Sequence, residues 1–86
     1  MRFHERLREL RKQSPIMQKD IAQKIGVSVR TFQQYEQGLL EPNIERLILL
    51  SKIFNVTVDF LICREEYLSE VGAAESETNL PEYPNV

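Results

Sequence analysis

Two short helical patterns separated by a three-residue link are the strongest constraint on the fold of this chain, and they lie between Gln18 and Gly38. Apolar residues recur at helical spacing on both sides of the link: Ile21, Ala22, Ile25, Phe32 and Tyr35. Gly26 opens the link and tolerates the positive φ that so tight a connection needs, while Ser28 is suited to cap the second helix. Ala22 is small enough for the two helices to cross closely. The sequence therefore predicts two crossed helices that share one core.

The same spacing continues through most of the chain, and no stretch alternates apolar and polar residues as a strand would. We predict an all-α bundle of five helices: one from Phe3 to about Gln13, one closed by Gly26, one from Ser28 to Gly38, one from Pro42-Asn43 to Asn55, and one capped by Thr57. The fifth helix either ends near Ile62 or continues to Gly72. Residues 73–86 are acidic and contain two prolines, so we expect them to be disordered or loosely docked.

Charge divides the chain into two parts. Residues 1–62 contain ten Lys/Arg and seven Asp/Glu, a net charge of +3, whereas residues 63–86 contain one Arg and six Glu, a net charge of −5. The total of −2 over 86 residues therefore hides a mildly basic domain, 1–62, followed by an acidic extension, 63–86. Binding to phosphates depends on where the charge lies, so the acidic total does not exclude a nucleic-acid partner.

Several classes of protein are disfavoured. No apolar run approaches the roughly 20 residues that span a bilayer, and the first ten residues are too charged for a secretory signal. A single cysteine, Cys63, allows no internal disulfide and no cysteine-rich zinc site. The chain lacks a nucleophile–base pair, and His4 has no companion metal ligand. We expect a cytoplasmic protein that is not an enzyme and needs no metal or cofactor.

The predicted helix after Ser28 has two chemically different sides. At 100° per residue, the side facing away from the core carries one guanidinium and three amides: Arg30, Gln33, Gln34 and Gln37. Val29 and Thr31 flank this side near the start of the helix. Gln can pair with adenine through two hydrogen bonds, Arg can pair with guanine, and methyl groups pack on thymine. This outer side is therefore suited to the edges of base pairs.

Three quoted stretches carry a family resemblance: RLRELRKQ, MQKDIAQKIGVSVRTFQQYEQG and PNIERLILLSKIFNVTVDFLI. Over residues 3–62 the chain resembles the Cro and lambda-repressor type of helix-turn-helix protein, the XRE family. That resemblance implies a lambda-repressor-like five-helix bundle that binds double-stranded operator DNA as a dimer and regulates transcription, most often as a repressor.

The resemblance also implies roles for individual residues. Val29, Arg30 and Gln34 would meet base edges, with Thr31 and Gln33 beside them. The expected phosphate contacts are Gln18, Ser28, Gln37 and Asn43, and the expected structural ion pair joins Arg11 and Glu36. The family often has Lys or Arg after the glycine that ends the recognition helix, but this chain has Leu39-Leu40-Glu41. The two leucines either cover the core or contact a partner.

Surplus apolar residues near the end of the bundle suggest the dimer surface: Phe54, Val56, Val58, Leu61, Tyr67 and Leu68. A single recognition helix reads too few base pairs for useful specificity, so a homodimer on two half-sites is expected. Two alternatives stay open. The protein could be an antitoxin or phage-type regulator whose acidic tail binds a protein partner, or an interaction module that has lost DNA binding.

Overall fold

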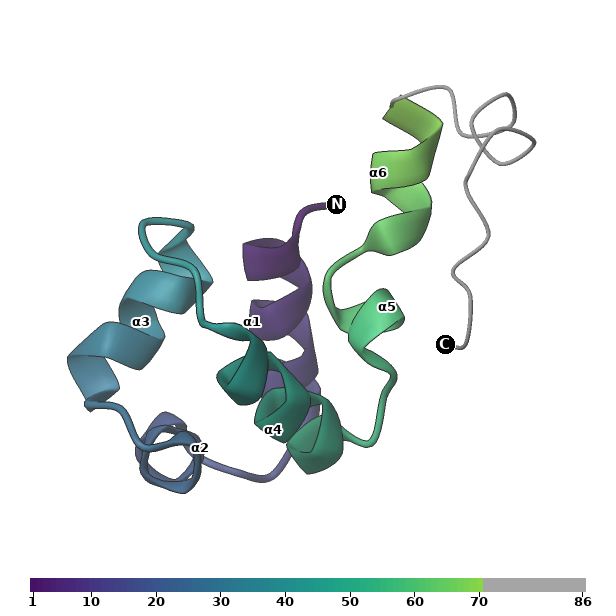
Figure 1. Ribbon diagram of the computed structural model, residues 1–86. Helices are drawn as coiled ribbons and strands as arrows, with labels where there is room; N and C mark the ends of the chain where they lie inside the picture. The colour runs from purple at the N-terminus through teal and green to yellow at the C-terminus, as the bar shows by residue number, and fades with distance from the viewer. Residues whose placement is uncertain (71–86) are drawn as a thin grey trace.

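The computed structural model describes residues 1–70, and within them it shows six helices and no strand (Figure 1). The helices are α1 Phe3–Gln13, α2 Gln18–Ile25, α3 Val29–Gln37, α4 Ile44–Phe54, α5 Val58–Leu61 and α6 Arg64–Glu70. The predicted all-α fold is confirmed, and α1 to α5 lie where the apolar spacing predicted them. None of the helices in this part of the chain has the length and apolarity needed to cross a membrane.

Side chains at the helix starts fix where three of the helices begin. The side-chain oxygens of Ser28, Asn43 and Thr57 each accept a hydrogen bond from the backbone N–H three residues later, at 3.0, 2.8 and 3.0 Å. Each bond satisfies an N–H that has no partner inside the helix. At the other end of α2, Gly26 adopts φ 78°, in the left-handed region that favours glycine. The short turn between α2 and α3 is thus encoded locally, as the sequence predicted.

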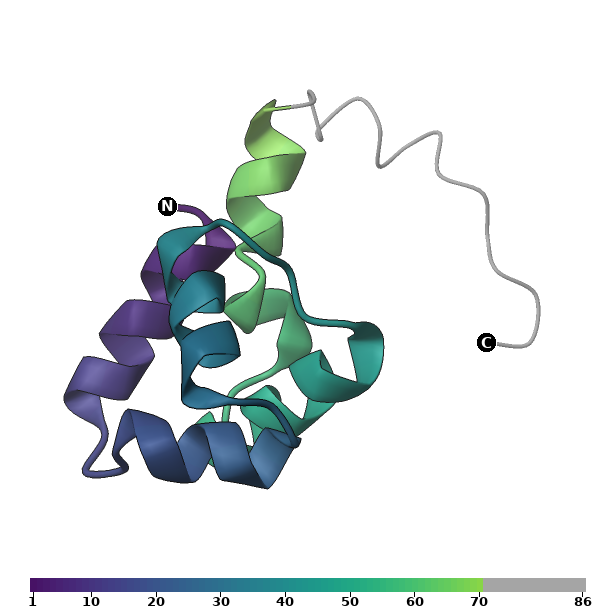
Figure 2. The same cartoon turned by 90° about the vertical axis from the view of Figure 1, so that its left-hand side faces the viewer.

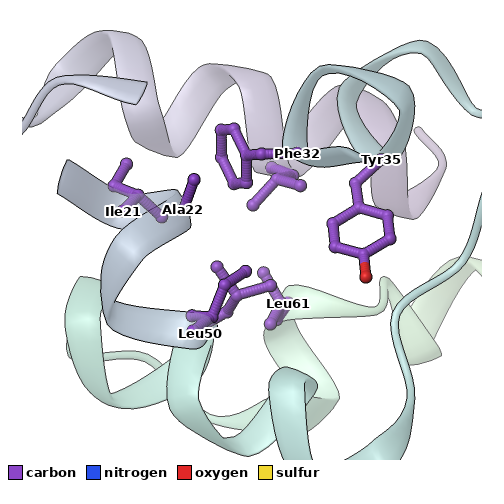
Figure 3. Packing of buried hydrophobic residues seen from close by; sticks show 8 residues of the cluster. Ile21, Ala22, Phe32, Tyr35, Leu50 and Leu61 are labelled. Atoms are coloured by element: carbon purple, nitrogen blue, oxygen red, sulfur yellow. The ribbon is translucent and has the colours of Figure 1, made fainter. Parts of the chain in front are cut away.

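The core lies between the five helices of the bundle. Each of α1 to α5 contributes one large, fully buried side chain: Leu7, Ile21, Phe32, Leu50 and Leu61. Figure 3 shows residues of this cluster converging on the space between the helices. Leu61 therefore does not belong to the expected dimer surface, because a side chain that closes the monomer's own core is not exposed to a second copy.

Of the two alternatives for the fifth helix, the structure has the one that ends near Ile62, and the helical pattern that follows forms a separate helix, α6. Cys63 adopts φ 60°, which ends α5 and turns the chain before α6 begins at Arg64. Both views show α6 projecting beyond the rest of the bundle (Figures 1 and 2). A positive φ interrupts the hydrogen bonds of a right-handed helix, and it is uncommon for residues other than glycine. The spacing of apolar residues does not reveal such a break. The expectations for residues 73–86 lie outside the described residues.

One side chain of α1 holds the start of α6. Arg6 Nη1 donates to the carbonyl of Phe60 and to Glu65 Oε1, each at 2.6 Å, and its guanidinium lies 4.1 Å from the centroid of the Phe60 ring. The N-terminal ammonium also pairs with Glu66. Hydrogen bonding to Arg6 lowers the pKa of Glu65 below its ordinary value. Opposite charges therefore hold the start of α6 against α1 and the N-terminus.

Acidification is expected to loosen α6 from α1. Because the folded-state pKa of Glu65 is lowered, its ion pair stabilises the contact above the ordinary glutamate pKa of about 4.3, and this contribution is lost as the pH falls through the lower folded value. Amide hydrogen exchange along α6, compared at about pH 6 and pH 3, measures the change after correction for intrinsic rates. Glu65→Gln is the control: a pH response of the same size in this variant would contradict the assignment.

Candidate nucleic-acid interface

Helix α3 buries one side in the bundle and leaves the other exposed. Phe32, Tyr35 and Glu36 are buried, at 0%, 2% and 5% exposure. In Figure 2, α3 crosses the face turned to the viewer, with α2 below it. The residues expected to meet bases are all accessible: Val29, Arg30 and Gln33 are exposed, and Thr31 and Gln34 are half-buried. The structure thus brings the five expected base contacts onto one accessible surface.

Arg30 has a free guanidinium. Within residues 1–70 it makes no hydrogen bond, ion pair or ring contact, and its side chain is exposed. By contrast, Arg6, Arg8, Arg11 and Arg46 each donate to a partner inside the protein. A guanidinium without an internal partner loses no internal bond when it binds a ligand, so Arg30 is well placed to recognise one.

The first turn of α3 carries a hydroxyl pair. Ser28 Oγ accepts from the backbone N–H of Thr31 and lies 3.0 Å from Thr31 Oγ1, to which it donates. Because one proton is used between these two hydroxyl oxygens, the pair has one proton left to donate outward. The cap therefore orders the hydroxyl of Thr31 as well as the start of the helix. Ser28 itself serves first as a structural cap, a role compatible with a ligand near the backbone N–H groups of this turn.

A buried ion pair joins α3 to α1. Arg11 Nε donates to Glu36 Oε2 at 2.5 Å, and its Nη2 donates to Glu36 Oε1 at 3.0 Å. Gln18 Nε2 also donates to Glu36 Oε1, at 3.2 Å, and Gln33 Nε2 lies 3.4 Å from Gln18 Oε1. The side chain of Glu36 is only 6% exposed and that of Arg11 is 23% exposed. These bonds connect α1, α2 and α3 through polar side chains.

A shallow hollow beside the start of α3 gathers positive charge. Arg11, Lys12 and Lys19 line it together with Gln18 and Val29. Lys12 and Lys19 were not among the residues expected to contact DNA. In the sequence, the only hint of such a role is that both lysines lie within six residues of Gln18. Lys12, however, lies on α1, whereas Gln18 and Lys19 lie on α2. Only the packing of α1 and α2 against α3 places these lysines at the same edge as the exposed side of α3.

The loop after α3 offers little to an anionic ligand. Leu39 is 71% exposed and Leu40 45% exposed, so the interpretation of these residues as core cover was wrong. Gln37 is exposed at the end of α3, and Asn43 is exposed while its Oδ1 caps α4. Between residues 37 and 43, the side-chain donors are the amide NH₂ groups of Gln37 and Asn43. Residues 37–43 contain none of the Lys or Arg residues that the family often places here to contact phosphates.

The residues expected at a dimer surface are not equally accessible. Phe54, Val56 and Val58 are half-buried, and Tyr67 and Leu68 lie on α6. Two exposed apolar residues nearby were missed, namely Phe60 at 45% exposure and Ile62 at 39%. Phe60 lies at the surface, with the guanidinium of Arg6 over its ring.

These features are those of a helix-turn-helix protein, and comparison with known sequences identifies the family. The sequence model described as Helix-turn-helix matches residues 7–61, and the chain belongs to this family. It is 34% identical over 85 residues to the transcriptional activator BcrR of Enterococcus faecalis, covering 99% of this chain and 41% of BcrR. It is 30% identical over 80 residues to the cryptic phage CTXphi transcriptional repressor RstR of Vibrio cholerae, covering 93% of this chain and 62% of RstR.

The fold is also similar to that of solved repressor structures. The P22 c2 repressor, solved in complex with a synthetic operator, superposes with a TM-score of 0.68 at 35% identity, covering 72% of this chain and 94% of that one. BcrR and two Bacillus subtilis regulators are longer, and the chain spans 41% to 54% of their lengths. The likeness to the P22 c2 repressor, by contrast, extends over nearly all of that solved chain.

Proposed function

We propose that this protein binds a specific site on double-stranded DNA and regulates transcription, acting as a repressor. The observation that carries the proposal is the outer side of α3, where an unpaired guanidinium and two amides stand on a helix whose opposite side is buried. These groups match the donor and acceptor patterns of base edges in the major groove. The similar fold of the P22 c2 repressor, solved with its operator, supports the same use of this surface.

Each group of residues takes one part in the proposed complex. The base contacts are Val29, Arg30, Thr31, Gln33 and Gln34. The phosphate contacts are Gln18, Ser28, Gln37 and Asn43, joined by Lys12 and Lys19 from the basic hollow. No catalytic step is proposed. Action on DNA implies the compartment that holds it, which for the bacterial relatives is the cytoplasm.

We further propose that two copies bind together. The loop after α3 lacks basic residues, so one copy has few phosphate contacts and needs a second for useful affinity. The proposed dimer surface keeps Phe54, Val56, Val58, Tyr67 and Leu68 and adds the exposed Phe60 and Ile62. Residues 1–62 then form the DNA-binding domain, and residues 63–86 are an acidic extension that begins at this surface.

Selection of bound sequences from random double-stranded DNA tests the function and the assembly together. We expect an enriched inverted repeat whose half-sites lie about 34 Å apart, one helical turn. Affinity for it is expected to fall with salt at a logarithmic slope of about −0.9 for each phosphate contact. Absence of any enriched sequence would contradict the proposed function. An enriched single half-site, bound by one copy, would contradict the dimer alone.

Replacing Arg30 by alanine is expected to relax the base preference at one position in each half-site, because the guanidinium offers two parallel donors to guanine. The loss of discrimination there should be about 1–3 kcal/mol, with smaller changes elsewhere. Repeating the selection with the purified variant measures it. Lys52→Ala, which removes an exposed cation from α4, is the matched control and should select the wild-type sequence. An unchanged preference in Arg30→Ala would remove Arg30 from the base contacts.

A second role is favoured by the acidic extension. Residues 63–86 carry a net charge of −5, and α6 projects from the bundle where a basic protein surface could reach it. We propose that the acidic extension binds a basic protein partner, as in an antitoxin or a phage-type regulator, in addition to the DNA binding of residues 1–62. A chain shortened by residues 73–86 should keep its DNA preference and lose the partner. Equal partner binding by both chains would contradict the addition.

A further inference from the structure

Four polar side chains form one hydrogen-bonded series from the bundle interior to the outer side of α3. Arg11 of α1 donates to Glu36 through two nitrogens. Glu36 Oε1 also accepts from Gln18 Nε2 at 3.2 Å, and Gln18 Oε1 lies 3.4 Å from Gln33 Nε2. The series begins at a nearly buried ion pair and ends at an exposed amide. Gln33 is thus an exposed residue whose orientation depends on a buried one.

The chemistry of the ion pair gives this series a direction. A carboxylate paired with a guanidinium only accepts hydrogen bonds, so Gln18 must turn its NH₂ group toward Glu36. Its Oε1 then faces the opposite way, toward Gln33, and that oxygen can only accept. Gln33 must therefore supply one of its two N–H groups to Gln18. The oxygens of Glu36, which accept from Arg11 and Gln18, in this way decide which groups the exposed Gln33 has left to offer.

We propose that Gln18 is a positioning residue through which the Arg11–Glu36 pair makes Gln33 read adenine and reject guanine. The inference rests on the proposed function, since it concerns the base that one residue reads. After donating to Gln18, Gln33 retains one N–H and its Oε1. Adenine offers one acceptor, N7, and one donor, N6, which this remaining pair matches. Guanine offers two acceptors, N7 and O6, and two-point pairing with it would need both N–H groups.

Three selections from random DNA test this proposal. The wild type is expected to select adenine at the position that Gln33→Ala leaves without preference. Gln18→Met removes both the donor and the acceptor at nearly the same side-chain length, so it frees both N–H groups of Gln33. In that variant guanine should become acceptable at the same position, with the adenine-to-guanine ratio falling by about fivefold or more. Gln23→Met, the same change at an exposed position of α2, should keep the wild-type ratio.

The effect of Gln18→Met on different DNA sequences distinguishes a positioning role for Gln18 from a simple phosphate contact. If Gln18→Met lowers affinity for all sequences equally and keeps the adenine preference, Gln18 only touches the backbone and the proposal is overturned. If Gln33→Ala changes no position, Gln33 reads no base and the proposal also fails. In both cases the wild type still selects a sequence, so the proposed function stands. A wild type that selects no sequence overturns both.

A second measurement covers the case in which Gln18→Met does not fold. In the free wild-type protein, NMR can follow solvent exchange of the two side-chain amide protons of Gln33. One of them is expected to exchange more slowly than the other, by a larger ratio than for Gln23, whose side chain has no hydrogen-bond partner within residues 1–70. Equal ratios at the two residues would show that Gln33 is not held, and would overturn the proposal without reference to DNA.

Discussion

Replacing Phe32 by alanine is expected to lower the free energy of unfolding by about 3–5 kcal/mol. Phe32 is fully buried at the centre of the bundle, so the substitution removes its apolar contacts and leaves a cavity that the neighbouring helices cannot close. Small domains have a total stability of only about 5–15 kcal/mol. A large part of the Phe32→Ala population should therefore be unfolded at moderate temperature, with its DNA binding lost in proportion.

Urea unfolding followed by circular dichroism measures this change. Ile44→Ala is the matched control, because it truncates a large apolar side chain that is 75% exposed on α4. The control should shift the free energy of unfolding by no more than about 0.5 kcal/mol. Similar losses in the two variants would mean that Phe32 does not have the central place in the core that the structure gives it.

Replacing Arg11 by methionine is expected to cost about 2–4 kcal/mol of unfolding free energy, slightly below the usual range for breaking a buried pair. The variant leaves the carboxylate of Glu36 inside the bundle with Gln18 as its remaining side-chain donor. The expected loss is reduced because the side chain of Arg11 is 23% exposed, so water can reach part of the space that it leaves.

A double variant shows whether the uncompensated charge is the cause. Arg11→Met combined with Glu36→Gln removes the charge as well as its partner, so it should be more stable than Arg11→Met alone. Urea unfolding of the wild type, both single variants and the double variant completes the cycle. A double variant whose loss equals the sum of the two single losses would show that the pair is not energetically coupled.

Local sequence was sufficient to predict the two crossed helices. Ser28 caps α3 and Gly26 turns the chain after α2, and each does so through its own backbone and nearest neighbours. The spacing of Phe32 and Tyr35 placed the amide-rich side outward, where the structure has it. Predictions succeeded here because every determinant lies within a few residues along the chain.

Predictions that required distant contacts were less successful. Leu61 was assigned to a dimer surface but closes the core, and Phe60, which was not assigned to that surface, is exposed under Arg6. A separate α6 was not predicted either, because it depends on the left-handed backbone of Cys63, which ends the helical run after α5. A cysteine carries no strong signal for that conformation, because it is not glycine or asparagine.

The sequence by itself therefore determined the class of fold and the chemical character of the outer side of α3, because helix periodicity and capping are local properties of the chain. Tertiary structure alone decided which hydrogen bonds hold the side chains on that side of α3. The family resemblance implied the Arg11–Glu36 pair, but only the packed helices set Gln18 of α2 between Glu36 and Gln33. No spacing rule joins residues on three different helices, since the distances between them exist only once the helices have packed.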